Sequence, residues 1–276
     1  MLENIKNGWE REKRVHFDEI VENYDRVRWN YPDELYEDIF DYTKTNISKN
    51  AIEIGAGTGK ATLPFLENGY NVTAIELGVN MAEYLKDKFK DNNKFNVIIS
   101  AFEDTSLEKE NYDLVFAASS FHWVDLEVGC PKVFSILRNG GVFALFRSNN
   151  LSDRDHDLYS EFQEVYKKYY HKPYVEPIKL TEEEFWEPKR INGGFGFNDL
   201  CDYGFIDISK KHYYSEIIYN SDDYIGLLDT MSDHRSLPEN DRKGLYTGIK
   251  EIILKHGGLY KVKYFYQLYM GRKPNK

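Results

Sequence analysis

Apolar and polar positions in the first half of the chain follow two periods, one typical of helices and one of buried strands. Phe17, Ile20, Val21 and Tyr24 recur at helical spacing, and Pro32 begins a second helix, since proline suits the first turn. Short apolar runs then predict strands at 51–55, 71–75, 95–100, 112–117 and 142–147. Helices are predicted between them at 61–68, 80–90 and 128–137. This alternation predicts a parallel sheet covered on both faces.

The pattern changes after Asn150. Residues 151–200 are rich in Tyr, Glu, Lys and Pro and do not continue the repeat, whereas 206–219 is β-like. Further on, helices are predicted near 222–231 and at 239–256, and a last strand at 260–271. The last helix is expected to end at Gly257 and Gly258.

Glycines gather at the junction between the first predicted strand and the helix after it, in the run EIGAGTG at residues 53–59. Because glycine has no Cβ, backbone amides in such a turn can approach a ligand closely. The dinucleotide fingerprint G-x-G-x-x-G would require a third glycine at position 60, where this chain has Lys60. The alternative interpretation is a plain tight turn between strand and helix.

Two further strand ends carry candidate chemistry. Glu76 ends the second predicted strand, where a carboxylate can accept hydrogen bonds from both hydroxyls of a ribose; the alternative is a surface carboxylate that begins a loop. The fourth strand runs into ASSFHWVD at residues 118–125. Ligands of open α/β sheets bind at the carboxyl ends of strands, so His122 and Trp123 are candidate site residues, with burial in the core as the alternative.

The spacing of the glycine run, with Glu53 ahead of it, resembles the first motif of class I S-adenosylmethionine-dependent methyltransferases. The stretch around His122 is similar to that of small-molecule methyltransferases related to trans-aconitate methyltransferase. In the same group a Y-x-x-x-R-P-x-Y-P segment is similar to YDRVRWNYP at residues 24–32, where Trp29 replaces the first proline, and an H-R-x-L-P stretch is similar to HRSLP at 234–238.

This resemblance implies a Rossmann-like α/β fold with a seven-stranded, mostly parallel sheet, helices on both faces and a helical lid insertion. Residues 1–150 would hold the N-terminal helices and the cofactor-binding core, and 151–220 the lid over the substrate. Residues 221–276 would supply the C-terminal helices and the strand that completes the sheet.

The cofactor implied by the resemblance is S-adenosyl-L-methionine. Arg28 is expected to pair with its methionyl carboxylate, with an exposed helix-end arginine as the alternative, and Met81 to pack on the adenine ring. Ser100 stands where the family often has an acidic residue, and either Glu103 or a backbone N–H is the candidate substitute. The residues expected to bind the cofactor are Arg28, Glu53, Gly55, Gly57, Gly59, Glu76, Met81, Ala101, Phe102, Glu103 and Ala118.

The implied reaction is direct in-line transfer of a methyl group to a small-molecule acceptor. A carboxylate acceptor needs no general base, whereas for a hydroxyl or amine acceptor His122 is the candidate catalytic base. Trp123, Arg147 and Arg235 are the candidate acceptor-binding residues, and the two arginines suit a carboxylate. A nucleotide-binding oxidoreductase and a non-catalytic module that binds S-adenosylmethionine are the alternatives.

Charge, cysteine content and hydropathy argue against a nucleic-acid substrate, a disulfide framework, a metal site and a membrane span. A net charge of −10 and an isoelectric point near 5.3 argue against nucleic acid as a substrate. The two cysteines, Cys130 and Cys201, are far apart and lack metal-ligand spacing, so neither a disulfide framework nor a metal site is indicated. No apolar run approaches membrane-spanning length, so we expect a cytoplasmic protein without membrane contact. Oligomeric state cannot be predicted.

Overall fold

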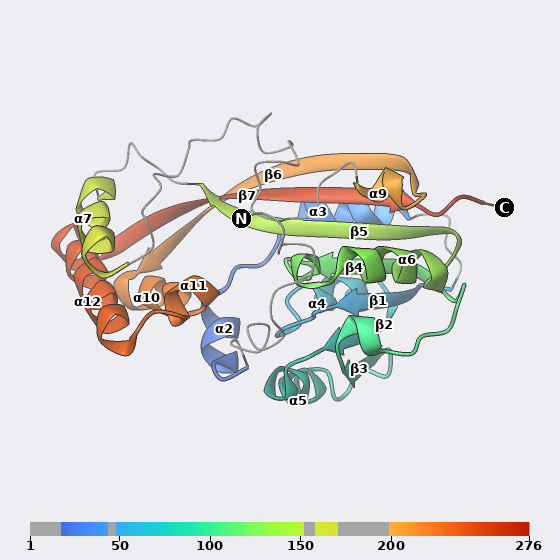
Figure 1. Ribbon diagram of the computed structural model, residues 1–276, viewed down its shortest axis with the longest axis horizontal. Helices are drawn as coiled ribbons and strands as arrows, with labels where there is room; N and C mark the ends of the chain where they lie inside the picture. The colour runs from blue at the N-terminus through green and yellow to red at the C-terminus, as the bar shows by residue number, and fades with distance from the viewer. Residues whose placement is uncertain (1–17, 44–47, 152–157, 171–198, 276) are drawn as a thin grey trace.

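A computed structural model of the chain describes residues 18–43, 48–151, 158–170 and 199–275. Its strands form one sheet in the order β3-β2-β1-β4-β5-β7-β6 (Figure 1). The strands are β1 (Asn50–Ile54), β2 (Asn71–Glu76), β3 (Phe95–Ile99), β4 (Tyr112–Ala118), β5 (Leu137–Leu151), β6 (Ile206–Asn220) and β7 (Leu259–Arg272). The α-helices are α2 (Val21–Val27), α3 (Asp33–Tyr42), α4 (Thr62–Glu67), α5 (Val79–Lys88), α6 (Leu126–Ile136), α7 (Tyr159–Tyr169), α9 (Asp199–Asp202), α10 (Ser221–Asp229), α11 (Ser232–Arg235) and α12 (Glu239–Lys255). Two short 3-10 helices are η2 (Phe102–Asp104) and η3 (Phe121–Trp123).

Strands β1 to β5 run parallel, and β7 pairs antiparallel with both β5 and β6. The predicted Rossmann-like fold with a seven-stranded, mostly parallel sheet is therefore confirmed. Strand β1 lies between β2 and β4, so the chain adds strands on one side of β1 and then on the other. Such a switch in strand order leaves a crevice at the carboxyl ends of the central strands, and this is where ligands bind in open α/β sheets.

Both faces of the sheet are covered. Because adjacent residues of a strand point to opposite faces, each central strand contributes side chains to two cores. Phe116 of β4 packs in a core with Leu35 of α3 and Phe65 of α4. Its neighbour Val115 packs in a second core with Val133 of α6. The two layers hold the carboxyl ends of β1, β2 and β4 in fixed positions.

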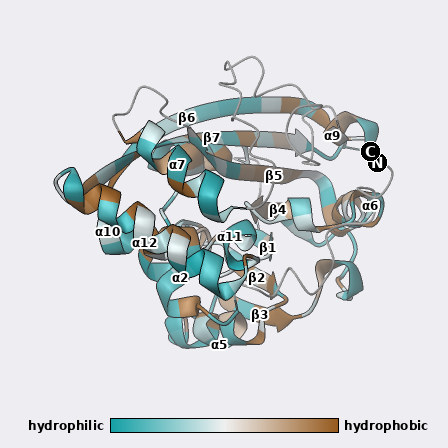
Figure 2. Cartoon of the chain, turned by 60° about the vertical axis from the view of Figure 1, so that its left-hand side comes forward, coloured by the Kyte–Doolittle hydropathy of each residue, from teal (hydrophilic) through white to brown (hydrophobic). Residues whose placement is uncertain are grey.

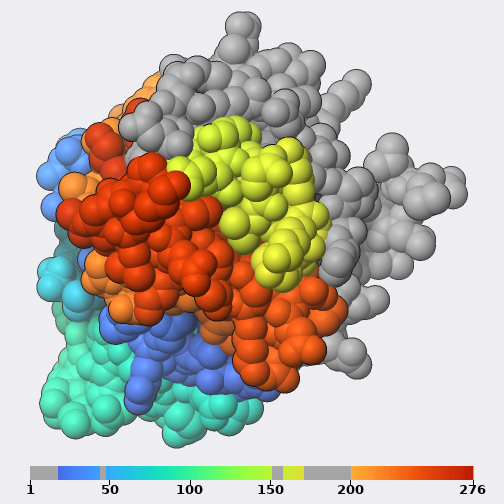
Figure 3. Space-filling model, turned by 90° about the vertical axis from the view of Figure 1, so that its left-hand side faces the viewer, coloured from blue at the N-terminus to red at the C-terminus, as the bar shows by residue number. Residues whose placement is uncertain are grey.

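A third core lies beyond the end of the parallel strands, where β6 and β7 extend away from the sheet (Figure 1). Helices α7, α10 and α12 supply its buried side chains, among them Phe162, Leu228 and Ile249. Figure 3 views this end of the molecule, with α7 in yellow-green beside α12 in red. Helix α10 also packs against α2, so this helical end contacts the segment that precedes the parallel strands.

Strand β6 forms one edge of the sheet and appears mainly hydrophilic in Figure 2. Ile206, Tyr214 and Ile218 are its exposed large apolar side chains. Polar residues interspersed along an exposed edge disfavour pairing with another chain.

The first four predicted strands match β1 to β4 within one residue at each end. Strand β5 is longer than predicted and includes residues 139–141, which lie between the predicted helix at 128–137 and the predicted strand at 142–147. The reason is pairing with the chain after β7: the Gly140 amide donates to the Lys273 carbonyl at 3.0 Å, and the Lys273 amide to Gly141 at 2.8 Å.

Only part of the predicted insertion at 151–220 lies within the described residues. It contains α7, and its last fifteen residues form β6, which belongs to the sheet. Residues 152–157 and 171–198 lie outside the described residues, as does Phe17. None of the described helices combines the length and apolar character needed to cross a membrane.

Candidate functional site

The main pocket of the described residues lies at the carboxyl ends of β1, β2 and β4, and we call it the glycine-loop pocket. It occupies the switch in strand order, where a ligand site is expected. Of the predicted cofactor residues, nine line it: Arg28, Gly55, Gly57, Glu76, Met81, Ala101, Phe102, Glu103 and Ala118. The structure therefore brings together residues of β2, β4, α5 and η2 and of the loops between elements.

The glycines of the loop have different surroundings. Gly57 adopts φ +58°, and a Cβ there would point into open space with Tyr24 as its nearest neighbour at 4.0 Å. At Gly55 a Cβ would lie 2.7 Å from Ser120, and at Gly59 it would lie 2.6 Å from Phe89. Gly57 therefore leaves the pocket open, whereas Gly59, which does not line the pocket, allows close packing behind it.

Glu76 joins the end of β2 to the glycine loop. Its carboxylate accepts hydrogen bonds from the Gly57 amide at 2.8 Å and the Gly78 amide at 2.9 Å. Burial raises the pKa of this carboxyl, while these amides oppose the rise. A carboxylate accepts about four hydrogen bonds, so Glu76 keeps capacity for hydroxyl donors in the pocket.

Glu53, another predicted cofactor residue, does not line the pocket. Its side chain is 0% exposed, and Oε2 accepts a hydrogen bond from the Thr62 hydroxyl at 2.6 Å. Burial raises the pKa of Glu53 to about 8. The side chain thus links β1 to α4 behind the loop.

Another part of the pocket lining is mainly apolar. Met81, Ala101 and Phe102 are buried, and Phe102 lies in the 3-10 turn after β3. Glu103 follows on the same turn, and its Oε1 lies 3.4 Å from the Asp125 amide, which donates to it. A flat apolar ring with a polar edge suits this part of the pocket.

Arg28 reaches the pocket from the end of α2. Its Nε donates to the Thr230 hydroxyl at 2.7 Å, and its Nη2 to the Thr230 carbonyl at 2.6 Å. The guanidinium also lies 5.0 Å from the ring centres of both Tyr24 and Trp29. Arg28 is thus held in place by the residue that follows α10, far along the chain.

A smaller second chamber shares Ser119 and Ser120 with the glycine-loop pocket, and we call it the Arg147 chamber. It is lined by Ala117, Ser119, Ser120, Phe121, His122, Leu145, Phe146, Arg147 and Tyr269. Ser119, on the shared wall, adopts φ +54°, which is uncommon for a residue other than glycine, and its hydroxyl lies 2.7 Å from that of Tyr31. The two cavities therefore adjoin at a strained, hydrogen-bonded serine.

The two predicted residues in this chamber are His122 and Arg147. Burial, together with the positive charge of Arg147, lowers the pKa of His122 to about 4. The Arg147 Nε donates to Gln267 at 2.9 Å, whereas its buried Nη2 has no hydrogen-bond partner among the described residues. The chamber therefore combines a neutral imidazole with a guanidinium whose donors are only partly used.

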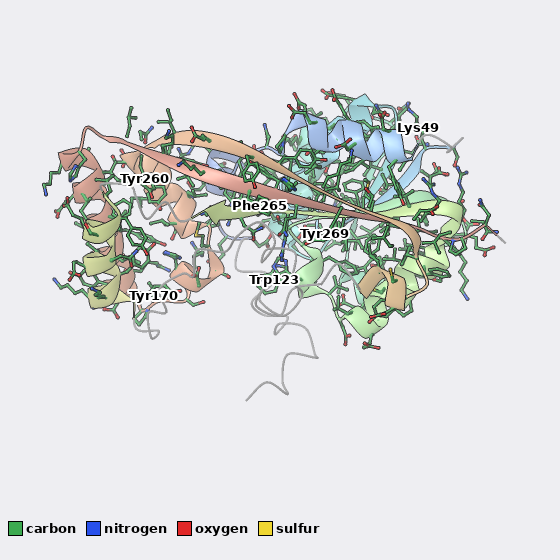
Figure 4. All side chains as sticks on the ribbon, turned by 90° about the horizontal axis from the view of Figure 1, so that it is seen from above. Lys49, Trp123, Tyr170, Tyr260, Phe265 and Tyr269 are labelled. Carbon is green, nitrogen blue, oxygen red and sulfur yellow. The ribbon has the colours of Figure 1, made fainter. Side chains whose placement is uncertain are left out.

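The other two predicted acceptor residues lie elsewhere. Trp123 lines the glycine-loop pocket and not the Arg147 chamber. Arg235 lines neither, because its guanidinium pairs with Asp229 at 3.0 Å and with Glu19 at 3.1 Å. In Figure 4, Trp123 and Tyr269 lie near the middle of the molecule, while Tyr170 and Tyr260 lie at the helical end.

Several lining residues were missed by the sequence analysis. Tyr24, Trp29 and Tyr31 belong to the segment that the resemblance singled out, but only Arg28 was selected from it. Lys60 directly follows the glycine run, a position that offered a signal. Asp18 offered none, because its place depends on a contact between its carboxylate and the Met81 amide at 2.8 Å.

Comparison with known proteins is consistent with this site. Residues 52–145 match the family model described as "Methyltransferase domain". A probable S-adenosylmethionine-dependent methyltransferase of Saccharomyces cerevisiae is 32% identical over 128 residues, which cover 45% of this chain and 44% of the yeast protein. A malonyl-[acyl-carrier protein] O-methyltransferase of Acetivibrio thermocellus is 24% identical over 259 residues, or 90% of this chain and 87% of that protein.

Among solved structures, a putative type II methyltransferase from Anaeromyxobacter dehalogenans superposes with a TM-score of 0.57. The match covers 90% of this chain and 99% of that one at 19% sequence identity. At this identity the likeness concerns the fold alone.

Proposed function

Because the chain is an S-adenosylmethionine-dependent methyltransferase, we propose that it methylates a small molecule through a carboxylate bound in the Arg147 chamber. The observation that carries this proposal is the buried Nη2 of Arg147, which has no hydrogen-bond partner among the described residues. An unpaired buried donor on a charged group is costly, and a carboxylate is a strong partner for a guanidinium.

The residues of the glycine-loop pocket fit the methyl donor. Glu76 would accept hydrogen bonds from the ribose hydroxyls, and the open side of Gly57 would admit the methionyl part. Met81 and Phe102 would pack on the adenine, with Ala101, Glu103 and Ala118 along its edge. When bound, S-adenosylmethionine supplies an electrophilic methyl group on its sulfonium.

The chain's own contribution is then to bind and align. Arg147 would hold the acceptor carboxylate in the chamber, and the shared wall at Ser119 and Ser120 puts that chamber next to the donor pocket. The apolar residues Phe121, Leu145 and Phe146 line the chamber and would exclude water from it.

The low pKa of His122 supports a carboxylate over a hydroxyl or amine acceptor. With a pKa of about 4 the imidazole is neutral at pH 7, but it is a weak base. An ionised carboxylate is already a nucleophile and needs no base. We therefore assign His122 a role in shaping and hydrogen bonding within the chamber.

Two resemblances support the same acceptor class. The similar Acetivibrio thermocellus protein is named as a malonyl-[acyl-carrier protein] O-methyltransferase. The segments at 24–32 and 118–125 are similar to those of the trans-aconitate methyltransferase group, to which we propose this chain is related. The contacts of Arg235 with Asp229 and Glu19 leave Arg147 as the proposed anion-binding residue.

A methyl-transfer assay over small carboxylic acids, phenols and amines tests this proposal, with Arg147→Met and Arg235→Gln beside the parent. We expect turnover of carboxylic acids and a fall in kcat/KM of about tenfold or more in Arg147→Met, because a charge-assisted hydrogen bond is lost. Arg235→Gln should keep the parent's acceptor preference. Turnover confined to phenols or amines, and insensitive to Arg147→Met, would contradict the carboxylate assignment.

A further inference from the structure

The side chains that line the glycine-loop pocket differ in charge from one part to another. Glu76 and Asp18 are near each other, since the charge of Asp18 contributes to the raised pKa of Glu76. Arg28 and Lys60 are the cationic side chains of the lining. The pocket thus offers acceptors for hydroxyl groups and, separately, cations for an anionic group.

Arg28 is largely engaged already. Two of its nitrogens donate to Thr230, and its guanidinium lies against two aromatic rings. Moving it toward a ligand would break the link between the end of α2 and the end of α10. Arg28 is therefore better suited to lining the pocket than to binding an anion through two hydrogen bonds.

Lys60 has more freedom to bind a ligand. Its ammonium lies 3.9 Å from Asp25 Oδ1, beyond hydrogen-bond distance, and it has no hydrogen bond among the described residues. Asp25 already accepts hydrogen bonds from the Tyr84 hydroxyl at 2.8 Å and from the Lys88 ammonium at 3.2 Å. The side chain of Lys60 is 20% exposed, and burial lowers its pKa. The partly buried ammonium thus has a long ion pair with Asp25, whose carboxylate is already hydrogen-bonded to other side chains.

We propose that Lys60 binds the α-carboxylate of the methionyl part of S-adenosylmethionine through its ammonium group. The inference rests on the proposed function in one respect, that the glycine-loop pocket is the methyl-donor site. Lys60 directly follows Gly59, so it extends from the same loop whose open side faces the pocket at Gly57. An ammonium group at this position can pair with a carboxylate of a bound ligand.

Calorimetry with two ligands that differ in the carboxylate tests this assignment. S-adenosylhomocysteine carries the amino-acid part, whereas 5′-methylthioadenosine lacks it. In Lys60→Met the affinity for S-adenosylhomocysteine should fall about tenfold or more, because a charged hydrogen-bond donor is lost. The affinity for 5′-methylthioadenosine should stay at the parent's value, and Lys60→Arg should retain most of the preference for S-adenosylhomocysteine.

Lys88→Met is the matched control, because Lys88 contacts Asp25 and the Thr58 carbonyl but does not line the pocket. It should leave the ratio of the two affinities unchanged. Lys60→Gln repeats the test with a polar side chain in case Lys60→Met folds poorly. Equal loss of both ligands, or no loss of either, in both Lys60 variants would overturn the assignment. A parent protein that binds neither ligand would instead refute the donor site itself.

Discussion

The carboxylate of Glu76 accepts a hydrogen bond from the backbone amide of Gly57 at 2.8 Å. This bond joins the end of β2 to the loop after β1, so the acidic residue and the glycine turn form one unit. Both were predicted as binding residues from their separate positions in the sequence. The contact puts both at the same wall of the pocket, so we propose that they bind the same ligand.

Replacing Glu76 with alanine should weaken binding of S-adenosylhomocysteine by about 1–3 kcal/mol, because the ribose hydroxyls lose a charged acceptor. Calorimetry measures this directly. The parent should also bind a 2′-deoxy analogue less well than S-adenosylhomocysteine, and Glu76→Ala should reduce that difference. Normal binding by a folded Glu76→Ala protein would mean that the carboxylate only supports the loop.

Gly57→Val should abolish binding of S-adenosylhomocysteine, since the new side chain would project into the pocket. Gly257→Val is a matched control: Gly257 also has positive φ, at +99°, and a Cβ there would meet nothing within 4 Å. Both variants should lose about 1–3 kcal/mol of stability from backbone strain. If both retain normal affinity, the glycine loop does not contact the ligand.

Thr230→Val tests the link from the helical end of the molecule to the pocket. The substitution removes the hydroxyl that accepts the Arg28 Nε bond at 2.7 Å and keeps the side chain's size. We expect a loss of about 1 kcal/mol in unfolding free energy and a few-fold weaker binding of S-adenosylhomocysteine. Denaturant unfolding and calorimetry give the two values. Lower stability with unchanged affinity would show that this contact does not shape the pocket.

Acid should destabilise the fold through His122. Its pKa is about 4 in the folded protein, against about 6.5 when unfolded, so the unfolded state binds more protons between these values. Above pH 6.5 the stabilising contribution of the neutral imidazole to the free energy of unfolding is fully present. As the pH falls toward 4 the free energy of unfolding decreases, by about 3 kcal/mol at most.

The check is denaturant unfolding of the parent and His122→Gln across pH 4–7. The parent should lose more stability than His122→Gln on acidification. His212→Gln, on the edge strand β6, controls for removing an imidazole outside the chamber. Parallel stability curves for the parent and His122→Gln would contradict a buried, neutral His122.

Local patterns in the sequence predicted the parallel core well because each buried strand is a short apolar run that ends in turn residues. The glycine turn and Glu76 were found for the same reason: both lie next to a strand end. Glu53 does not line the pocket, because its side chain bonds to Thr62, and sequence position alone does not decide which side of the loop a side chain faces.

Contacts between distant segments could not be predicted. Arg235 pairs with Glu19, 216 residues away, and Arg28 bonds to Thr230, 202 residues away. No periodicity or spacing encodes such pairs. The same holds for the proximity of Arg147 to Gln267, which depends on β7 running antiparallel to β5.

The central claim, that the glycine-loop pocket holds the methyl donor, is tested most directly by calorimetric titration of the parent with S-adenosylhomocysteine and, separately, with NAD. We predict one S-adenosylhomocysteine site per chain, a raised melting temperature in its presence, and no binding of NAD. Binding of NAD without binding of S-adenosylhomocysteine would contradict the account.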